Sequence, residues 1–383
     1  MIWKTFLLAL GLAALGTGAE AQDVSLRVRT PIRLPDLPGY VTLKCDFHIH
    51  TVFSDGLVWP TVRVEEAWRE GLDAIAITDH IEYQRFKADV STNHNRSYEI
   101  AREAGADLNV LVIRGAEITR QMPPGHLNAL FLSDANALAV PDWFDALQAA
   151  RKQGAYIMWN HPGWAAQLVD QRAQWFPEHT RILEADLMHG IEIINGGEYY
   201  PEAYEWAIAR NLPILGNTDI HQAINLDYNV QGGGQRPLTL VFARERTVES
   251  IKEALFNRRT AVLASGKIFG EARFLTPLFE GSVQVPNAAP RRERTLLQLH
   301  NDSSVDFLLE RAAKPEGVSI PERITLWAGK TALVEVRGLG KLPAAISRLD
   351  LSWRVTNLLT APKTPLTVKL EVPVAAPAPA KNR

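Results

Sequence analysis

The chain has 383 residues, with 41 basic and 43 acidic side chains and a formal net charge of -2. This balance gives no overall positive field for a long nucleic acid, and the length suffices for one large domain and a smaller one. Cys45 is the single cysteine, so an internal disulfide is excluded and any metal ligands must be nitrogen and oxygen atoms.

The first 21 residues are typical of an export signal. Lys4 supplies a positive charge, residues 6–15 form a short apolar run, and residues 19–21 (Ala-Glu-Ala) form a small-residue cleavage site. The apolar run is too short to cross a bilayer, and a buried N-terminal helix is the alternative. We therefore expect a mature chain that begins near Gln22, is periplasmic or secreted, and has no membrane span after signal removal.

After a proline-rich lead-in at 22–40, apolar strand-like runs alternate with helical patterns. The runs are 41–47, 74–78, 110–115, 127–132, 155–159, 190–194, 213–216 and 238–242, and the helical segments are 63–70, 97–104, 143–152, 201–209 and 248–257. Strands rich in Ile, Val and Leu that alternate with helices predict a parallel sheet covered on both faces. Because the alternation is sustained, we predict an α/β fold with a closed βα barrel over 41–270.

The pattern changes after residue 275. Short strand-like stretches follow one another at 296–299, 307–309, 325–327, 332–336, 349–353 and 366–372, with turn residues between them. This spacing predicts a small all-β, sandwich-like domain over 275–373. The Ala-Pro-rich, basic end at 374–383 is predicted to be a disordered tail.

Nine candidate metal ligands fall at the expected ends of the barrel strands. His48 and His50 close the first run and share a strand face, because residues two apart point to the same side. Asp219 and His221 repeat this spacing after the seventh run. The other five candidates are Asp55, His80, Glu117, His126 and His161. The carboxyl ends of the strands are where the loops of a βα barrel build active sites.

Six imidazoles and three carboxylates without a thiolate suit Mn, Zn or Fe. Nine ligands exceed the need of one ion, so we expect two or three divalent transition metals if the side chains converge. Each residue alone has an ordinary alternative. A histidine at a strand end is commonly a hydrogen-bonded rim residue, Asp55 fits a turn, and Glu117 fits the start of a helix. Their shared position favours the cluster.

Five segments carry the most specific signal. They read DFHIHT and SDG within 46–56, GLDAIAITDH at 71–80, GAEIT at 115–119, NHP at 160–162 and TDIH at 218–221. These segments resemble the motifs of the PHP (polymerase and histidinol phosphatase) family of metal-dependent phosphoesterases, over roughly residues 41–268. The resemblance implies a distorted seven-stranded βα barrel. Segments 89–98 and 123–126 are similar to a secreted branch with phosphodiesterases that act on small organophosphate diesters.

The resemblance also implies how the nine ligands are shared. The first metal would be held by His48, His50, Glu117 and Asp219. The second would be held by Glu117, His126 and His161. The third would be held by Asp55, His80 and His221. Glu117 is thus the one bridging carboxylate.

We therefore predict a metal-dependent phosphoesterase that uses a metal-bridging hydroxide, namely a phosphodiesterase of small organic phosphate diesters. Its partner would be a small-molecule phosphate ester rather than a long nucleic acid. The alternatives are a phosphomonoesterase of the histidinol-phosphatase type, a metal-dependent amide or lactone hydrolase, and a non-enzymatic binding module. The predicted catalytic residues are Glu117, Asp219 and His221.

Candidate substrate contacts come from the loops near the ligand motifs. Arg120, His94 and Arg96 are candidates for contacting phosphate oxygens, and exposed loop residues are the alternative. Trp164 follows a ligand motif and suits an apolar substituent, as Trp59 and Tyr83 do in other loops, and ordinary loop packing is the alternative. Asp46 lies two residues before His48, so it is a candidate acceptor for the His48 ring N–H, or else a buried capping acid.

Overall fold

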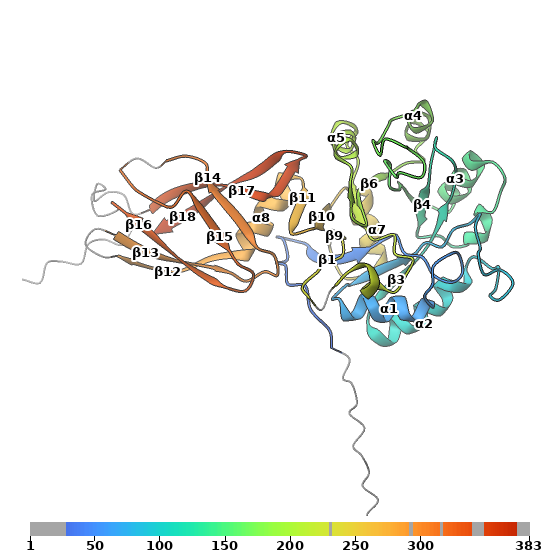
Figure 1. The fold of residues 1–383 in the computed structure, drawn as a ribbon, viewed down its shortest axis with the longest axis horizontal. Helices are drawn as coiled ribbons and strands as arrows, with labels where there is room; N and C mark the ends of the chain where they lie inside the picture. Colours follow the sequence, from blue (N-terminus) through green and yellow to red (C-terminus); the bar gives the residue numbers. More distant parts are fainter. Residues whose placement is uncertain (1–27, 230–231, 291–293, 315–316, 339–347, 374–383) are drawn as a thin grey trace, which may run out of the picture.

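The computed structural model describes residues 28–229, 232–290, 294–314, 317–338 and 348–373. The predicted export signal and the predicted tail at 374–383 lie outside the described residues. Among the described helices, none combines the length and the apolar character that a bilayer crossing requires. The chain forms two lobes along its longest axis, an N-terminal α/β lobe and a C-terminal all-β lobe (Figure 1).

All eight predicted runs of the N-terminal lobe form strands. They are β1 (Val41–Asp46), β2 (Ala74–Ile77), β3 (Leu111–Ile118), β4 (Leu127–Leu130), β5 (Tyr156–Trp159), β6 (Gly190–Asn195), β8 (Ile214–Asn217) and β9 (Leu238–Ala243). In space their order is β9-β1-β2-β3-β4-β5-β6, and β8 pairs with β6. The Thr239 hydroxyl of β9 lies 3.0 Å from both N and O of Gly216 in β8. This arrangement fits a distorted barrel in which a side chain of β9 makes the hydrogen bonds to β8.

The prediction of a wholly parallel sheet is wrong at two strands. β4 is antiparallel to both β3 and β5, and β9 is antiparallel to β1. The connection at 119–126 between β3 and β4 is too short for a crossover helix, so the chain turns back on itself. The start of β4 therefore lies at the same edge as the end of β3, which brings His126 to the rim.

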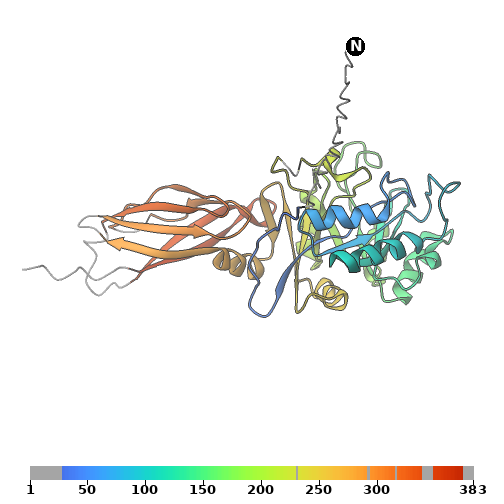
Figure 2. The same ribbon diagram turned by 90° about the horizontal axis from the view of Figure 1, so that it is seen from below.

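Helices cover the strands on the outside. The five predicted ones are α1 (Pro60–Arg69), α2 (Arg96–Leu108), α3 (Trp143–Lys152), α5 (Pro201–Arg210) and α7 (Val248–Phe256). The Asp142 side chain accepts the N–H groups of Phe144 and Asp145 at the start of α3, which fixes its first turn. α1 and α2 lie side by side (Figure 2). Four short or late segments were not predicted, namely η1 (Ala135–Leu138), α4 (Pro177–Glu184), α6 (Ile224–Asp227) and α8 (Ala272–Ser282).

The predicted all-β C-terminal lobe is confirmed. One sheet has the order β12-β13-β16, and in the other β17 pairs with β14 and β18, and β14 with β15. The bounds of these strands are β12 (Val283–Pro290), β13 (Arg294–Asn301), β14 (Phe307–Arg311), β15 (Arg323–Leu326), β16 (Thr331–Arg337), β17 (Arg348–Ala361) and β18 (Thr364–Pro373). The three strands not yet named, outside this lobe, are β7 (Glu198–Tyr199), β10 (Thr260–Ala264) and β11 (Lys267–Gly270).

The two lobes share a sheet and an apolar core. β11 pairs in parallel with β17, which continues the sheet of the first lobe into the second. The aromatic side chains of α8 face both ways, with ring centroids 4.8 Å apart for Phe242–Phe274 and 5.2 Å apart for Phe279–Phe307. Each such buried phenylalanine stabilises the folded chain by roughly 1.5–3 kcal/mol. The predicted division into domains at 270–275 stays a prediction.

Candidate metal centre

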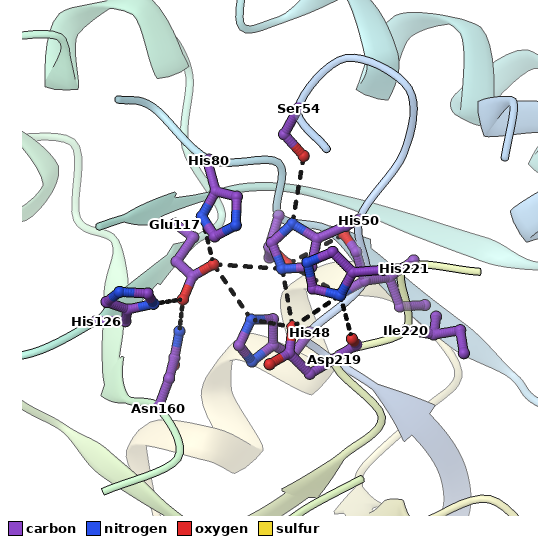
Figure 3. Close-up of polar contacts among 12 residues, drawn as sticks. His48, His50, Ser54, His80, Glu117, His126, Asn160, Asp219, Ile220 and His221 are labelled. Carbon is purple, nitrogen blue, oxygen red and sulfur yellow. Dashed lines mark hydrogen bonds and ion pairs between the residues drawn. The ribbon is translucent and has the colours of Figure 1, made fainter. Parts of the chain in front are cut away.

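The nine predicted ligands lie together at one end of the strands. Figure 3 shows the side chains of His48, His50, His80, Glu117, His126, Asp219 and His221 gathered there. Their ligand atoms form four groups, each with all atoms within 4.8 Å of one another. The groups are His50, Asp55, His80 and His221; His48, His161 and Asp219; His48, His50 and Glu117; and Glu117, His126 and His161. Their convergence follows from the strand ends that carry them, and their role as ligands stays a prediction.

The end of β1 is fixed by its neighbours on both sides. Ile49 donates its N–H to the Thr78 hydroxyl at 2.9 Å, and His50 donates its N–H to the Ile220 carbonyl at 3.1 Å. Phe47 and Ile49 point into the apolar core, at 0% and 1% exposure. The alternation of a strand therefore turns His48 and His50 to the opposite side, toward the cluster.

The loop that carries Asp55 returns close to the main chain of His50. A Cβ atom at Gly56 would lie 2.7 Å from the His50 carbonyl carbon and from the Thr51 nitrogen, so only glycine allows this approach. The loop places Asp55 Oδ1 at 3.4 Å from Nε2 of His80 and 3.2 Å from Nε2 of His221. Glycine at 56 thus allows Asp55 to lie close to His80 and His221, the residues of the predicted third metal site.

Two ligand candidates have left-handed backbone conformations. The φ angles of His161 and Asp219 are +26° and +55°. Such a conformation costs a residue with a side chain of order 1–3 kcal/mol and persists where the surroundings hold it. Asp219 donates its N–H to the His48 carbonyl at 2.9 Å, and His161 donates its N–H to Glu192 at 2.7 Å. These bonds hold both side chains toward the cluster.

Glu117 lies at the centre of the cluster and is 1% exposed. Its Oε2 atom lies 3.4, 3.3 and 2.8 Å from ring nitrogens of His48, His50 and His80, respectively. Its Oε1 atom lies 2.9 Å from Nδ1 of His126 and 3.6 Å from Nε2 of His161. The two oxygens face different histidines, which is the geometry that a carboxylate bridging two ions requires.

Six buried atoms of the cluster have no hydrogen-bond partner. They are Nε2 of His48, Nε2 of His50, Oδ1 of Asp55, Oε2 of Glu117, Nδ1 of His161 and Oδ1 of Asp219. An unsatisfied buried polar group costs about 1–3 kcal/mol, so such a concentration needs a compensating partner. A divalent cation would accept imidazole and carboxylate lone pairs together, and this nitrogen and oxygen set suits Zn, Mn or Fe. The residues therefore fit the expected metals.

The mixture of charges shifts the titration of the cluster. Burial alone would raise the pKa of Glu117, but His80, His48 and His126 hold that pKa well below its usual value. Burial would lower the pKa of His221, but Asp55 and Asp219 raise it to about 9. Without metal, His221 therefore holds a proton at neutral pH. A metal that binds the His221 ring therefore has to displace that proton.

The four predicted substrate contacts lie in different surroundings. The Trp164 ring lies 5.1 Å from that of His161 and 5.6 Å from that of His126. Arg120 pairs with Glu82 at 2.9 Å, and Arg96 pairs with Glu99 at 3.0 Å on the surface of α2. The main-chain N–H of His94 donates to Oδ1 of Asn136 at 3.0 Å. Of the four, Trp164 thus has its ring next to histidines of the cluster, and the substrate role of all four stays a prediction.

The acceptor for the His48 ring is not Asp46. It is Glu192, whose Oε1 lies 3.0 Å from Nδ1 of His48. Asp46 accepts the main-chain N–H groups of His48 and Thr218, both at 3.2 Å, and pairs with buried Arg236. These contacts agree with the alternative prediction, that Asp46 is a buried capping acid. Sequence reasoning missed Glu192. Its signal was a single charge inside the apolar run 190–194, because a carboxylate in a strand buried on both faces needs partners.

Comparisons with known proteins find a matching family model for each lobe. A family model described as the PHP domain matches residues 46–139, and a model described as an Ig-like domain matches residues 282–371. A solved two-domain protein of Bacteroides vulgatus, which contains a predicted PHP-like metal-dependent phosphoesterase, is 44% identical with a TM-score of 0.86. That alignment covers 91% of this chain and 100% of the other.

Two further similarities are more distant. An uncharacterised protein of Methanocaldococcus jannaschii is 35% identical over 82 residues, which are 21% of this chain and 36% of that protein. This chain thus matches about a third of that relative's length. A lesion-specific endonuclease of Pyrococcus furiosus is 12% identical with a TM-score of 0.41, over 65% of this chain and 62% of that one. Neither similarity supports a functional comparison.

The fold, the histidine and carboxylate cluster and the full-length similarity define a hydrolase of phosphoric ester bonds that depends on metal ions. The chain belongs to the PHP family. In this chain the PHP-type lobe is followed by a lobe that matches the Ig-like domain model.

Proposed function

We propose that this protein is a phosphodiesterase of small organic phosphate diesters. Its nine candidate ligands would hold two or three Mn, Zn or Fe ions. The observation that carries the proposal is the set of buried, unpartnered nitrogen and oxygen atoms around Glu117. Bound there, the metals would supply a hydroxide nucleophile at neutral pH and would offset the charge of the phosphate oxygens.

Three side chains of the cluster have further roles in this proposal. Glu117 keeps two metal subsites at a fixed separation, because each of its oxygens faces its own histidines. The side chains of Asp219 and His221 are 19% and 35% exposed, whereas those of His48 and His50 are fully buried. Substrate would therefore approach from the side of Asp219 and His221, and these two residues would contact the reacting phosphate group.

The preference for a diester rests on the cations and aromatic rings around the cluster. Arg120 is paired with Glu82, and buried Arg63 donates to the main-chain oxygens of His50 and His221. A dianionic monoester would gain from free fixed cations, but these two guanidinium groups are already engaged. Trp164 is 38% exposed and Tyr83 is 50% exposed. Such rings suit the apolar substituents of an organic diester.

The test is a rate comparison on the metal-loaded full chain. An aryl phosphate monoester and the matching diaryl diester would be compared, with a lactone and an amide as further substrates. We expect the diester to have the higher kcat/KM by at least about tenfold, and chelated protein to be inactive. A monoester preference would contradict the diester assignment. Turnover of the lactone or amide alone would favour the carbonyl hydrolase alternative.

The predicted export signal leads to a second part of the proposal. We infer that the protein is periplasmic or secreted, from the charged start, the short apolar run and the small-residue site at 19–21. N-terminal sequencing of cell fractions should find a chain that starts near Gln22 outside the cytoplasm. An intact Met1 in the cytoplasmic fraction would contradict this location.

A further inference from the structure

Glu192 is a buried carboxylate whose acceptor positions are all occupied. It is 0% exposed in the middle of β6. Its Oε1 lies 3.0 Å from Nδ1 of His48 and accepts from the Asn217 amide at 2.9 Å. Its Oε2 accepts the main-chain N–H of His161 at 2.7 Å and the Asn195 amide at 2.9 Å. A carboxylate has about four lone-pair sites, so four donors saturate it.

The contact with His48 fixes the chemistry of that ring. Because the Glu192 carboxylate accepts, the proton of the imidazole lies on Nδ1, and the lone pair of Nε2 turns toward the cluster. Nε2 of His48 lies 3.4 Å from Oε2 of Glu117 and 3.1 Å from Oδ1 of Asp219. The ring is therefore held in the one tautomer that can bind a metal at Nε2.

The contact with His161 acts on the backbone rather than on the ring. At a φ of +26°, the main chain of His161 is in a left-handed conformation that needs external support. The Glu192 oxygen at 2.7 Å supplies that support on the N–H group. His48 belongs to the first proposed metal subsite and His161 to the second, so one carboxylate holds a ligand of each.

We propose that Glu192 is a positioning residue that couples the two metal subsites bridged by Glu117. This inference rests on the proposed metal centre and adds to it a residue outside the ligand set. Partners of this kind typically contribute 10–100-fold to metal affinity. Because Glu192 contacts a ligand of both subsites, its loss weakens two metal equivalents together. The third subsite, formed by Asp55, His80 and His221, contains none of its four partners.

The glutamine variant separates this role from simple space filling. Glutamine has the same shape, but one oxygen becomes an amide that donates. If the amide faces His48, the ring proton has to move to Nε2, which removes the metal-binding lone pair. If the amide faces His161, the strained main-chain N–H loses its acceptor. Neither orientation of Glu192→Gln satisfies all four donors.

The experiment is a calorimetric titration of metal-free full-length protein with Zn²⁺ or Mn²⁺. We expect Glu192→Gln to weaken two equivalents by about 10–100-fold each and to leave any third one unchanged. Glu253→Gln is the control, because that carboxylate pairs with Arg259 and contacts no candidate ligand. Long-range proton–nitrogen NMR of the zinc-loaded protein should show a protonated Nδ1 on His48. Its signal should be lost or shifted in Glu192→Gln, because an amide replaces the carboxylate that accepts this proton. A role in packing alone would change neither reading.

Binding of all metal equivalents by Glu192→Gln with unchanged affinity would overturn the inference. If Glu192→Gln does not fold, Glu192→Asp decides the question. Its carboxylate is one methylene shorter and cannot reach both donor pairs, so two equivalents should again weaken together. Unchanged affinity in Glu192→Asp would overturn the inference too. A wild-type chain that takes up no metal would instead contradict the proposed function, and this coupling with it.

Discussion

Glu117 and His48 at the rim of the α/β lobe and Asn301 inside the Ig-like lobe are all buried polar residues, but their side chains differ in their hydrogen-bond partners. In the Ig-like lobe, Asn301 is 0% exposed and donates to the main-chain oxygens of Val305 and Leu326 at 2.8 and 2.9 Å. Its side-chain oxygen accepts from the N–H and the hydroxyl of Ser303. At the rim, Oε2 of Glu117 and Nε2 of His48 have no such partner. The fold itself thus supplies every partner of the Asn301 side chain, whereas the two rim atoms need a partner that a bound ligand would supply.

The backbone shows the same contrast. Among the described residues beyond 270, the positive φ angles belong to Gly317, Gly329 and Gly338. Glycine adopts these angles without a steric cost. At the rim, His161 and Asp219 adopt them although they carry side chains. At the rim, strained backbone at His161 and Asp219 thus lies beside unsatisfied polar atoms, a combination that is expected at a functional site.

Loss of the bridging carboxylate is the largest change that we expect. Glu117→Ala removes the oxygens that face five histidines, so it should lower kcat on a diester by at least about a thousandfold. This corresponds to roughly 4 kcal/mol of transition-state stabilisation. The fold should survive, because a rim ligand adds little to the apolar core. Circular dichroism, metal content and rate would be measured on the same sample, and a folded variant with near wild-type activity would refute the site.

The opposite result is expected in the Ig-like lobe. Asn301→Ala removes the amide that donates to the main-chain oxygens of Val305 and Leu326, and it leaves the main-chain N–H of Ser303 without its side-chain acceptor. The free energy of unfolding should therefore fall by about 1–3 kcal/mol. Metal content and the rate at saturating substrate should stay at the wild-type level. Denaturant unfolding and metal analysis check this. A loss of bound metal in Asn301→Ala would break the contrast between the two lobes.

The stability of the metal-free chain and its affinity for metal should change with pH in opposite directions because of His221. The raised pKa of His221, about 9 against an ordinary 6.5, favours the folded metal-free chain below pH 6.5, and this stabilisation is lost as the pH rises through 9. Metal competes with the same proton, so its affinity should instead rise by about tenfold per pH unit in that window. Thermal unfolding with and without metal at pH 6, 7.5 and 9 measures both trends. Parallel trends in the two samples would count against His221 as a ligand.

The smallest effect is expected from a change in the predicted third metal site, which consists of Asp55, His80 and His221. Asp55→Ala removes one ligand from the set with His80 and His221 and leaves Glu117 and its histidines in place. It should cost less than Glu117→Ala and mainly raise KM, with kcat reduced by less than about tenfold. Steady-state kinetics on a diester separates the two parameters. If Asp55→Ala were the more damaging change, the sharing of metals among the nine residues would be assigned incorrectly.

The strands and the ligand candidates were accessible from the sequence because both follow from short-range patterns. Apolar runs separated by helical patterns predicted eight of the eleven described strands of the α/β lobe, and the residues at their ends predicted the cluster. The strands β7, β10 and β11 were missed. The antiparallel direction of β4 and β9 was missed, because an apolar run carries no sign of its direction. The pairing of His48 with Glu192 was also missed, because 144 residues separate them and only the closed sheet brings them together. Asp46, two residues away, was the nearer and wrong candidate.

The claim that the rim is a multinuclear metal centre is tested most directly by counting its metals. Elemental analysis of the mature chain, expressed in metal-supplemented medium, should find two or three equivalents of Mn, Zn or Fe per chain. Glu117→Ala should lose metal from both subsites that it bridges, whereas Asn301→Ala should keep the wild-type count. One equivalent or fewer in the wild-type protein would contradict the account.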